Sequence, residues 1–151
     1  RGISSDVIQG FIDRVDPIVE GQPAKVFILG GVNDISHDLT PDSLCTSMEK
    51  LIVKIKQGSP RTKIYLQSLL PIDNSFGRYR KMVGKEQVIV ETNRLYKEMA
   101  ERHGVTWIDL YAKMVDPATG SMRKGLTNDG LHLLGAGYLV WRDAVLPYVK
   151  K

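Results

Sequence analysis

Several features are scarce or absent in this sequence of 151 residues, and each absence narrows the class of protein. A single cysteine, Cys45, excludes an intrachain disulfide. No stretch approaches the ~20 consecutive apolar residues that a membrane-spanning helix needs. Repeats, linker-like segments and low-complexity tracts are also missing. We therefore expect one domain that covers residues 1–151.

Motifs for metals and nucleotide cofactors are absent as well. The sequence has no H-x-x-x-H or C-x-x-C spacing, which argues against a zinc site. Gly30 and Gly31 follow an apolar stretch, but the G-x-G-x-x-G pattern of dinucleotide-binding folds does not occur. We therefore expect no metal ion and no organic cofactor.

Positive charge is in slight excess, with 21 Lys and Arg against 17 Asp and Glu and a net charge of +4. The one dense basic group is Arg78-Tyr79-Arg80-Lys81, with Lys85 nearby. Such a group can hold nucleic acid or an anionic substrate, but a short charge run is more often a solvated face. We expect no nucleic acid and no membrane among the partners, and the oligomeric state stays open.

The segment T-N-D-G-L-H-L, residues 127–133, places an acid and a histidine three residues apart, just before an apolar-periodic helix. Gly130 permits a bend between them, so the two side chains can face each other. In such a pair the Asp129 carboxylate orients the His132 imidazole, which acts as a general base toward a hydroxyl nucleophile. On its own, however, a D-x-x-H spacing is more often a capping Asp and a surface His.

A second motif lies about a hundred residues upstream. Gly30-Gly31-Val32-Asn33-Asp34 follows residues 25–29, a short apolar run typical of a buried parallel strand. Two glycines at the carboxyl end of a strand allow a tight turn and a close approach to a ligand, and Asn33 can present an amide N–H there. The alternative is that Asn33 is a turn residue that tolerates a left-handed conformation.

Together these motifs resemble blocks III and V of the SGNH hydrolases, also called GDSL esterases and acylhydrolases, whose patterns are G-x-N-D and D-x-x-H. The first six residues, R-G-I-S-S-D, are similar to the end of block II, N-R-G-I-S-G-D, with Ser5 where a glycine is common. The resemblance covers nearly the whole chain. It implies that Asp129 and His132 are catalytic, and that the Asn33 amide and the Gly2 backbone N–H belong to an oxyanion hole.

The sequence departs from the family at the nucleophile. The family uses the Ser of a G-D-S motif on its first strand, and no G-D-S occurs here. We therefore expect these residues to be the C-terminal part of a longer polypeptide, from block II onward, with the first two strands and the serine outside it. A catalytically dead remnant is the alternative. Because the two absent strands would pair beside residues 25–29, we also expect additional chain or another molecule along that edge.

Helices and strands alternate along the chain. Apolar periodicity and capping residues predict helices over 4–20, 41–58 and 86–103, a terminal helix from Leu134, and strands over 25–29, 63–70 and 105–110. Pro17 is a point at which the first helix can end or kink. Short connections between them imply a parallel sheet covered on both faces. The resemblance specifies this further as an α/β fold with three layers, α/β/α and flavodoxin-like, as in SGNH hydrolases.

Other polar residues fit structural roles better than catalytic ones. Asp109 is expected to bond backbone in the loop that follows it, and Asn93 to be a buried amide on its helix. No carboxylate lies at a matching spacing from His37 or His103. His103 comes just before a glycine that caps the helix, a position that favours a positively charged side chain.

The aperiodic segment 72–85 follows a strand, where α/β enzymes place loops that contact substrate. We expect it to set specificity, with a solvated connection as the alternative. With the family resemblance, this predicts a serine ester hydrolase that removes acetyl or short acyl groups from a small-molecule or carbohydrate ester. The alternative is an inactive SGNH-fold binding domain. A periplasmic or secreted location is favoured over the cytoplasm.

Overall fold

A computed structural model describes residues 7–150 of the chain. At its centre is a parallel sheet of three strands in the order β1-β2-β3, formed by Lys25–Ile28, Lys63–Gln67 and Thr106–Ile108. In the ladder, Val26 lies opposite Ile64 and Leu66 lies opposite Trp107. The α/β class and the parallel sheet expected from the sequence are confirmed.

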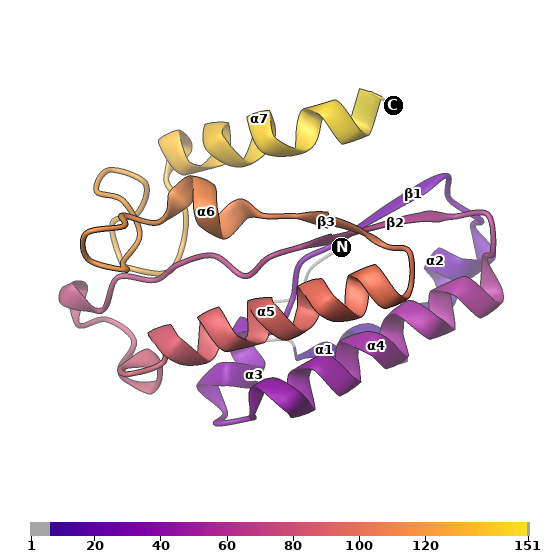
Figure 1. The fold of residues 1–151 in the computed structure, drawn as a ribbon, viewed down its shortest axis with the longest axis horizontal. Coiled ribbons are helices and arrows are strands. Elements are labelled where there is room, and N and C mark those ends of the chain that lie inside the picture. Colours follow the sequence, from indigo (N-terminus) through magenta and orange to yellow (C-terminus); the bar gives the residue numbers. More distant parts are fainter. Residues whose placement is uncertain (1–6, 151) are drawn as a thin grey trace.

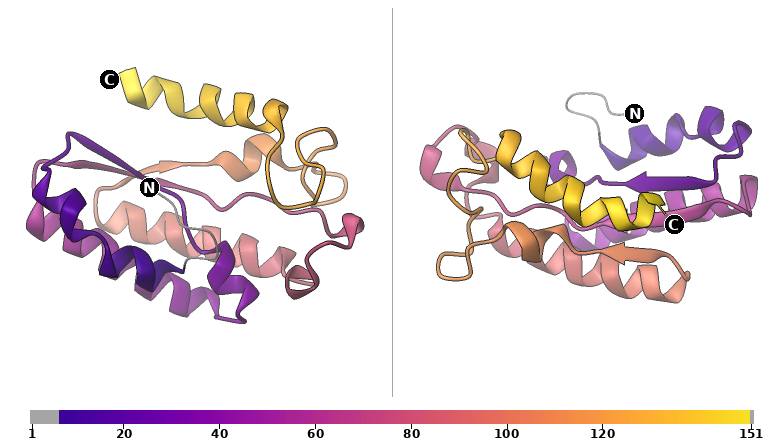
Figure 2. Two further views of the ribbon diagram at one scale, coloured as in Figure 1. Left: turned by 180° about the vertical axis from the view of Figure 1, so that it is seen from behind. Right: turned by 90° about the horizontal axis from the view of Figure 1, so that it is seen from above.

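Helices cover both faces of the sheet (Figure 1). The helices on one face are α1 (Ile8–Asp13), α2 (Asp16–Glu20), α4 (Pro41–Gly58) and α5 (Glu86–Arg102). The other face carries α7 (Gly135–Lys150), and α3 (Val32–Ser36) and α6 (Leu110–Met114) are short helices after β1 and β3. Figure 2 shows the same layers from two further sides. Over the described residues, no helix is both long enough and apolar enough to cross a membrane.

The central strand β2 supplies side chains to a core on each face of the sheet. Ile64 and Leu66 belong to the main core, which fills the space against α4 and α5. Tyr65 points the other way, into a smaller core with Ala144 of α7, and its ring stacks on Phe27 with centroids 4.6 Å apart. Because side chains alternate along a strand, an apolar run is needed where both faces are covered.

Helix α4 forms where the sequence predicts it. The Thr40 hydroxyl accepts a hydrogen bond from the Ser43 backbone N–H at 3.2 Å, and Pro41 occupies the first turn, where its missing N–H costs nothing. The residues that α4 buries share one face of the helix: Leu44, Met48, Leu51, Ile52 and Ile55. Full burial of such a side chain contributes roughly 1.5–3 kcal/mol as an upper estimate, so packing more than propensity holds α4 in place.

The structure differs from the sequence-based expectations at several element ends. The helix expected over 4–20 is divided, because Pro17 cannot continue a helix but fits the first turn of α2; residues 4–6 lie outside the described residues. The strands are shorter than expected, and α3 and α6 were not anticipated. Segment 72–85 contains two 3-10 turns, η1 (Asn74–Phe76) and η2 (Arg80–Met82).

Strand β1 is an edge strand. Within residues 7–150 it pairs with β2 alone, so no described strand lies along its outer side. The additional chain expected beside this edge is therefore not found among the described residues. Lys25, Val26 and Phe27 are nevertheless only half-exposed, because helices pack against both faces of the strand.

Candidate active site

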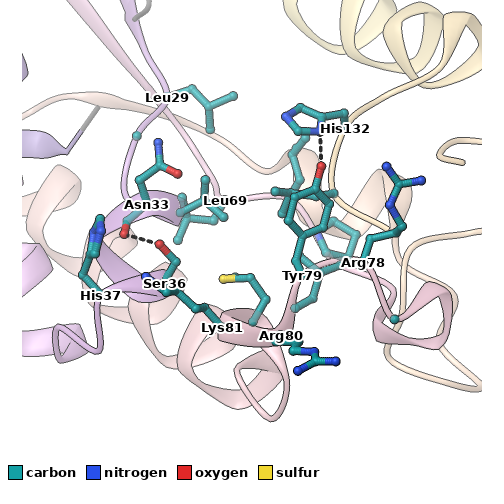
Figure 3. A pocket seen from close by; sticks show the side chains of 18 residues that line it. Leu29, Asn33, Ser36, His37, Leu69, Arg78, Tyr79, Arg80, Lys81 and His132 are labelled. Atoms are coloured by element: carbon teal, nitrogen blue, oxygen red, sulfur yellow. Dashed lines mark hydrogen bonds between the residues drawn. The ribbon is translucent and has the colours of Figure 1, made fainter. Parts of the chain in front are cut away.

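A cavity of about 830 Å³ opens where β1 and β2 end. Parallel strands end at the same edge of a sheet, so the segments that follow them meet there. The cavity is lined by the segment after β1, the segment after β2 and the loop before α7. Figure 3 shows Asn33, Ser36 and His37 on one side of the cavity, and Tyr79 and His132 on the other.

Asp129 and His132 face each other across the turn that precedes α7. His132 Nδ1 lies 2.9 Å from Asp129 Oδ2. The Asp129 side chain is only 15% exposed, whereas the His132 side chain is 70% exposed and lines the cavity. Since the carboxylate is an acceptor, Nδ1 carries the proton of the neutral ring and Nε2 is left as the basic nitrogen.

The Asp129 carboxylate receives hydrogen bonds on both of its oxygens. Oδ1 accepts from the backbone N–H groups of Leu131 and His132, each at 2.8 Å, and Oδ2 accepts from His132 Nδ1. Partial burial opposes ionisation, but the backbone donors Leu131 and His132 and the side chains of His132 and Tyr79 hold the pKa of Asp129 well below its ordinary value. Asp129 is therefore ionised at any physiological pH.

Gly130 lets this turn dock against the segment after β2. Its φ is +93°, and a Cβ at this position would lie 2.0 Å from the backbone oxygen of Asp73. The close approach allows Asp73 N–H to donate to the Gly130 carbonyl at 2.9 Å. Within the turn, the Thr127 hydroxyl also accepts from the Gly130 N–H at 3.0 Å. The position of His132 therefore depends on two loops that hold each other.

Asn33 lies on the opposite side of the same cavity. It occupies the first turn of α3, a short helix, whereas the sequence predicted only a loop. Gly31, with a φ of +127°, makes the turn from β1 into α3, and a Cβ there would lie 2.8 Å from Tyr96 Oη. The Tyr96 hydroxyl donates to the Gly30 carbonyl at 3.1 Å and braces the turn. Gly2, the other residue assigned to an oxyanion hole, lies outside the described residues.

The structure adds Tyr79 to the pair of Asp129 and His132. The Tyr79 hydroxyl lies 3.0 Å from Asp129 Oδ2 and 3.1 Å from His132 Nδ1, and the tyrosine and imidazole rings meet edge to face with centroids 5.8 Å apart. Partial burial and the hydrogen bond to Asp129 raise the pKa of Tyr79, so the phenol keeps its proton and can donate it. The sequence contained no signal for this contact, because Tyr79 lies in an aperiodic segment fifty positions before Asp129.

The other polar residues considered from the sequence have structural partners. Asp109 accepts from the Ala112 N–H at 3.0 Å and caps α6, and Asn93 bonds both backbone groups of Leu69 at 2.8 and 3.1 Å. His103 lies 2.7 Å from Glu49 Oε2. These contacts agree with the structural roles expected for the three residues.

The structure also places His37, Asp34 and Cys45. His37 lines the cavity, although its sequence context offered no partner. Asp34, which belongs to the G-G-V-N-D motif, is buried and accepts the Ile8 N–H at 3.1 Å, so it anchors the start of α1. The Cys45 thiol is half-buried, and this burial raises its pKa.

The cavity carries cations on one wall. Arg78, Arg80 and Lys81 line it from the segment after β2, and the described residues that line it include no Asp or Glu. Lys85, by contrast, is paired with Asp38 at 2.6 Å. Within residues 7–150, the potential ligands His, Cys, Asp and Glu do not gather into a group of three or more that could hold a metal ion.

Comparisons with known proteins agree on one family. The family model described as GDSL-like Lipase/Acylhydrolase matches residues 1–140. The search among curated proteins found no match.

Solved structures share the fold. A Streptococcus pneumonia protein provisionally designated a platelet activating factor is 29% identical with a TM-score of 0.87, and the match covers 98% of this chain and 70% of that one. A GDSL-like lipase from Bacteroides thetaiotaomicron is 23% identical with a TM-score of 0.89, over 99% and 74% of the two chains. An acetyl-xylooligosaccharide esterase from Geobacillus Stearmophilus is 18% identical with a TM-score of 0.78, over 97% and 69%.

The family match and the fold therefore indicate the same class of protein. The family model spans most of the chain, from the first residue to α7. The solved structures that share its α/β fold include a lipase and an esterase. The chain belongs to the GDSL-like lipase/acylhydrolase family and is, by type, a carboxylic ester hydrolase of the SGNH class.

Proposed function

We propose that the cavity hydrolyses an acetyl or short acyl ester, with His132 as the general base and Asp129 as the residue that orients it. The observation that carries this proposal is the 2.9 Å contact between His132 Nδ1 and Asp129 Oδ2 at the mouth of a cavity that Asn33 also lines. An imidazole held by an ionised carboxylate through Nδ1 keeps Nε2 available to accept a proton.

The reaction is acyl transfer to water through a hydroxyl nucleophile, which the family supplies from a serine. His132 Nε2 removes the hydroxyl proton as the oxygen attacks the ester carbonyl, and it then gives the proton to the leaving alcohol. Water hydrolyses the acyl intermediate by the same steps. The Asn33 amide, and by resemblance the Gly2 N–H, stabilise the negative oxygen of the tetrahedral intermediate.

The size and lining of the cavity support a small ester as the substrate class. A volume of about 830 Å³ lies in the range of small-molecule sites, and Leu29, Leu69 and Ile72 offer apolar contacts for a short acyl chain. The neighbour from Geobacillus Stearmophilus is an esterase of acetylated xylooligosaccharides. An acetylated carbohydrate is therefore the substrate that we propose for this chain.

The test is hydrolysis of a chromogenic acetate by the full gene product, including any residues encoded before Arg1. A general base contributes roughly 10²–10⁴-fold, so His132→Ala should lower kcat by at least about a hundredfold. Asn33→Ala should lower it by on the order of 10²–10³-fold if the amide stabilises the oxyanion. His103→Asn, at a histidine that follows α5 and is bonded to Glu49, is the matched control and should keep its activity. An unchanged rate in His132→Ala rejects the proposal.

A second candidate function is a binding domain that retains the fold without catalysis. A G-D-S motif missing from the intact gene product would favour it. The residues encoded before Arg1 decide between the two functions, because a serine nucleophile encoded there supports the esterase. An inactive gene product that still binds an acetylated oligosaccharide would support the binding domain.

A further inference from the structure

Tyr79 is held rigidly although it lies in a segment between β2 and α5 without regular structure. Gly77 turns the chain with a φ of +64°, and Tyr79 then leads into η2, where its carbonyl accepts the Met82 N–H at 3.0 Å. Met82 is 3% exposed and anchors the segment in the main core. The Asn74 amide bonds the Met82 carbonyl at 3.0 Å and the Glu86 carboxylate at 2.6 Å, which ties the segment to α5.

The same segment is docked against the turn that carries Asp129 and His132. Asp73 N–H donates to the Gly130 carbonyl, and Met122 N–H donates to the Ile72 carbonyl at 3.1 Å. The Tyr79 hydroxyl consequently reaches Asp129 Oδ2, the oxygen that also accepts the His132 Nδ1–H. A carboxylate can only accept, so the hydroxyl donates its proton to Oδ2.

We propose that Tyr79 is a positioning residue for the general base: its hydroxyl fixes the Asp129 carboxylate and limits how strongly that carboxylate favours protonated His132. This inference rests on the proposed function of Asp129 and His132. A donor on Oδ2 shares the negative charge that would otherwise act on the imidazolium alone.

The groups that surround the pair support an effect through Oδ2. On the facing segment the cations are Arg78, which acts on Tyr79, and Arg80 and Lys81, which also line the cavity. The Asp73 carboxylate is engaged with the Ser75 N–H and hydroxyl at 2.9 and 2.6 Å. Across the cavity the titratable group is His37 on the α3 side, and Figure 3 shows it well separated from His132. Tyr79 and Asp129 are thus the groups bonded directly to the imidazole.

Tyr79→Phe removes the hydroxyl and keeps the ring that contacts His132. In the full gene product we expect the acid limb of the kcat/KM profile to move to higher pH, because Asp129 then favours the imidazolium more strongly. At a pH on this limb the rate should fall roughly threefold to tenfold, and KM should stay within about twofold. NMR titration of the His132 imidazole should show the same upward displacement of its midpoint.

Tyr138→Phe, at an exposed tyrosine on α7 that does not line the cavity, is the matched control and should leave the profile unchanged. Tyr79→Leu is a second way to remove the hydroxyl, and its acid limb must move in the same direction even if the loss of the ring also raises KM. A profile identical to that of the unaltered protein, or an equal loss at every pH with an unmoved His132 titration, overturns the inference. Activity retained in His132→Ala would instead reject the proposed function itself.

Discussion

The two carboxylate oxygens of Asp129 have different partners. One accepts hydrogen bonds from the backbone of the turn, and the other faces the imidazole of His132. Oδ1 accepts the Leu131 and His132 N–H groups, whereas Oδ2 faces His132 Nδ1 and the Tyr79 hydroxyl. Rotation of the carboxyl group would break bonds on both sides. The direction of the imidazole is therefore set by the fold of the turn and not by the side-chain contact alone.

Gly130 is the residue in this turn that tolerates no side chain. Gly130→Ala should lower the free energy of unfolding by more than about 2 kcal/mol, because an alanine at a φ of +93° is strained and its Cβ would meet the Asp73 backbone oxygen. Gly120→Ala is the matched control, since Gly120 has a φ of +73° but nothing within 4 Å of its Cβ position. We expect it to cost only about 1 kcal/mol. Urea unfolding of both variants measures the difference, and equal losses would contradict the docking of the two loops.

At the scale of elements, α4 and α5 are joined by their apolar cores and by polar contacts near the end of α5. Glu49 on α4 accepts from His103 at 2.7 Å and from Arg102 at 3.2 Å, both at the end of α5. The hydrogen bond from His103, opposed by partial burial and aided by Arg102, lowers the pKa of Glu49. A carboxylate whose pKa is lowered by folding stabilises the protein at pH values above the ordinary pKa. This stabilisation is lost as the pH falls through the lowered pKa.

In Glu49→Gln, the free energy of unfolding should therefore fall less steeply as the pH is lowered into the acid range. As the pH falls below the ordinary glutamate value of 4.5, the unaltered protein loses the contribution of Glu49, whereas the variant has none to lose there. The measurement is the free energy of unfolding by urea between about pH 6 and pH 3. Glu101→Gln, at an exposed glutamate of α5, is the control and should keep the original slope. If the free energy of unfolding falls equally steeply with pH in Glu49→Gln and in the unaltered protein, the contact between Glu49 and His103 does not make stability depend on pH.

For the whole molecule, the arrangement of charge matters more than its sum. The net charge of the chain is only +4, yet Arg78, Arg80 and Lys81 line one cavity whose described lining has no carboxylate. A cleft lined by one sign of charge concentrates ions of the opposite sign. This field is screened over a Debye length of about 10 Å at 0.1 M salt.

An ester with a carboxylate on its alcohol side should accordingly be favoured at low ionic strength. We expect kcat/KM for such an ester to fall more steeply with NaCl than kcat/KM for a neutral acetate. The double variant Arg78→Gln and Lys81→Gln should reduce this slope, and Lys113→Gln, at an exposed position on α6, should not. The same salt dependence for both esters would show that these cations are a solvated surface without influence on the substrate.

Local contacts were predictable because sequence separation alone brings their partners together. The Thr40 cap acts over three residues, and so does the pair of Asp129 and His132. A structural, hydrogen-bonded role for Asn93 was foreseen from its place beside the apolar face of a helix; the structure leaves Asn93 partly exposed, and its partner Leu69 was not foreseen. Element ends were less predictable, because the last strand residues also satisfy helix caps, as Asp109 does for α6.

The alternation of strands and helices, the parallel sheet, and the turn in which an acid faces a histidine could all be predicted from the order of residues. Each of these follows from side-chain periodicity or from spacing within one turn. Contacts between distant segments became visible only in the folded chain, where Tyr79 reaches Asp129 and Asn33 shares a cavity with His132. Such meetings depend on how helices and loops pack over the sheet, and packing joins residues whose separation along the chain carries no signal.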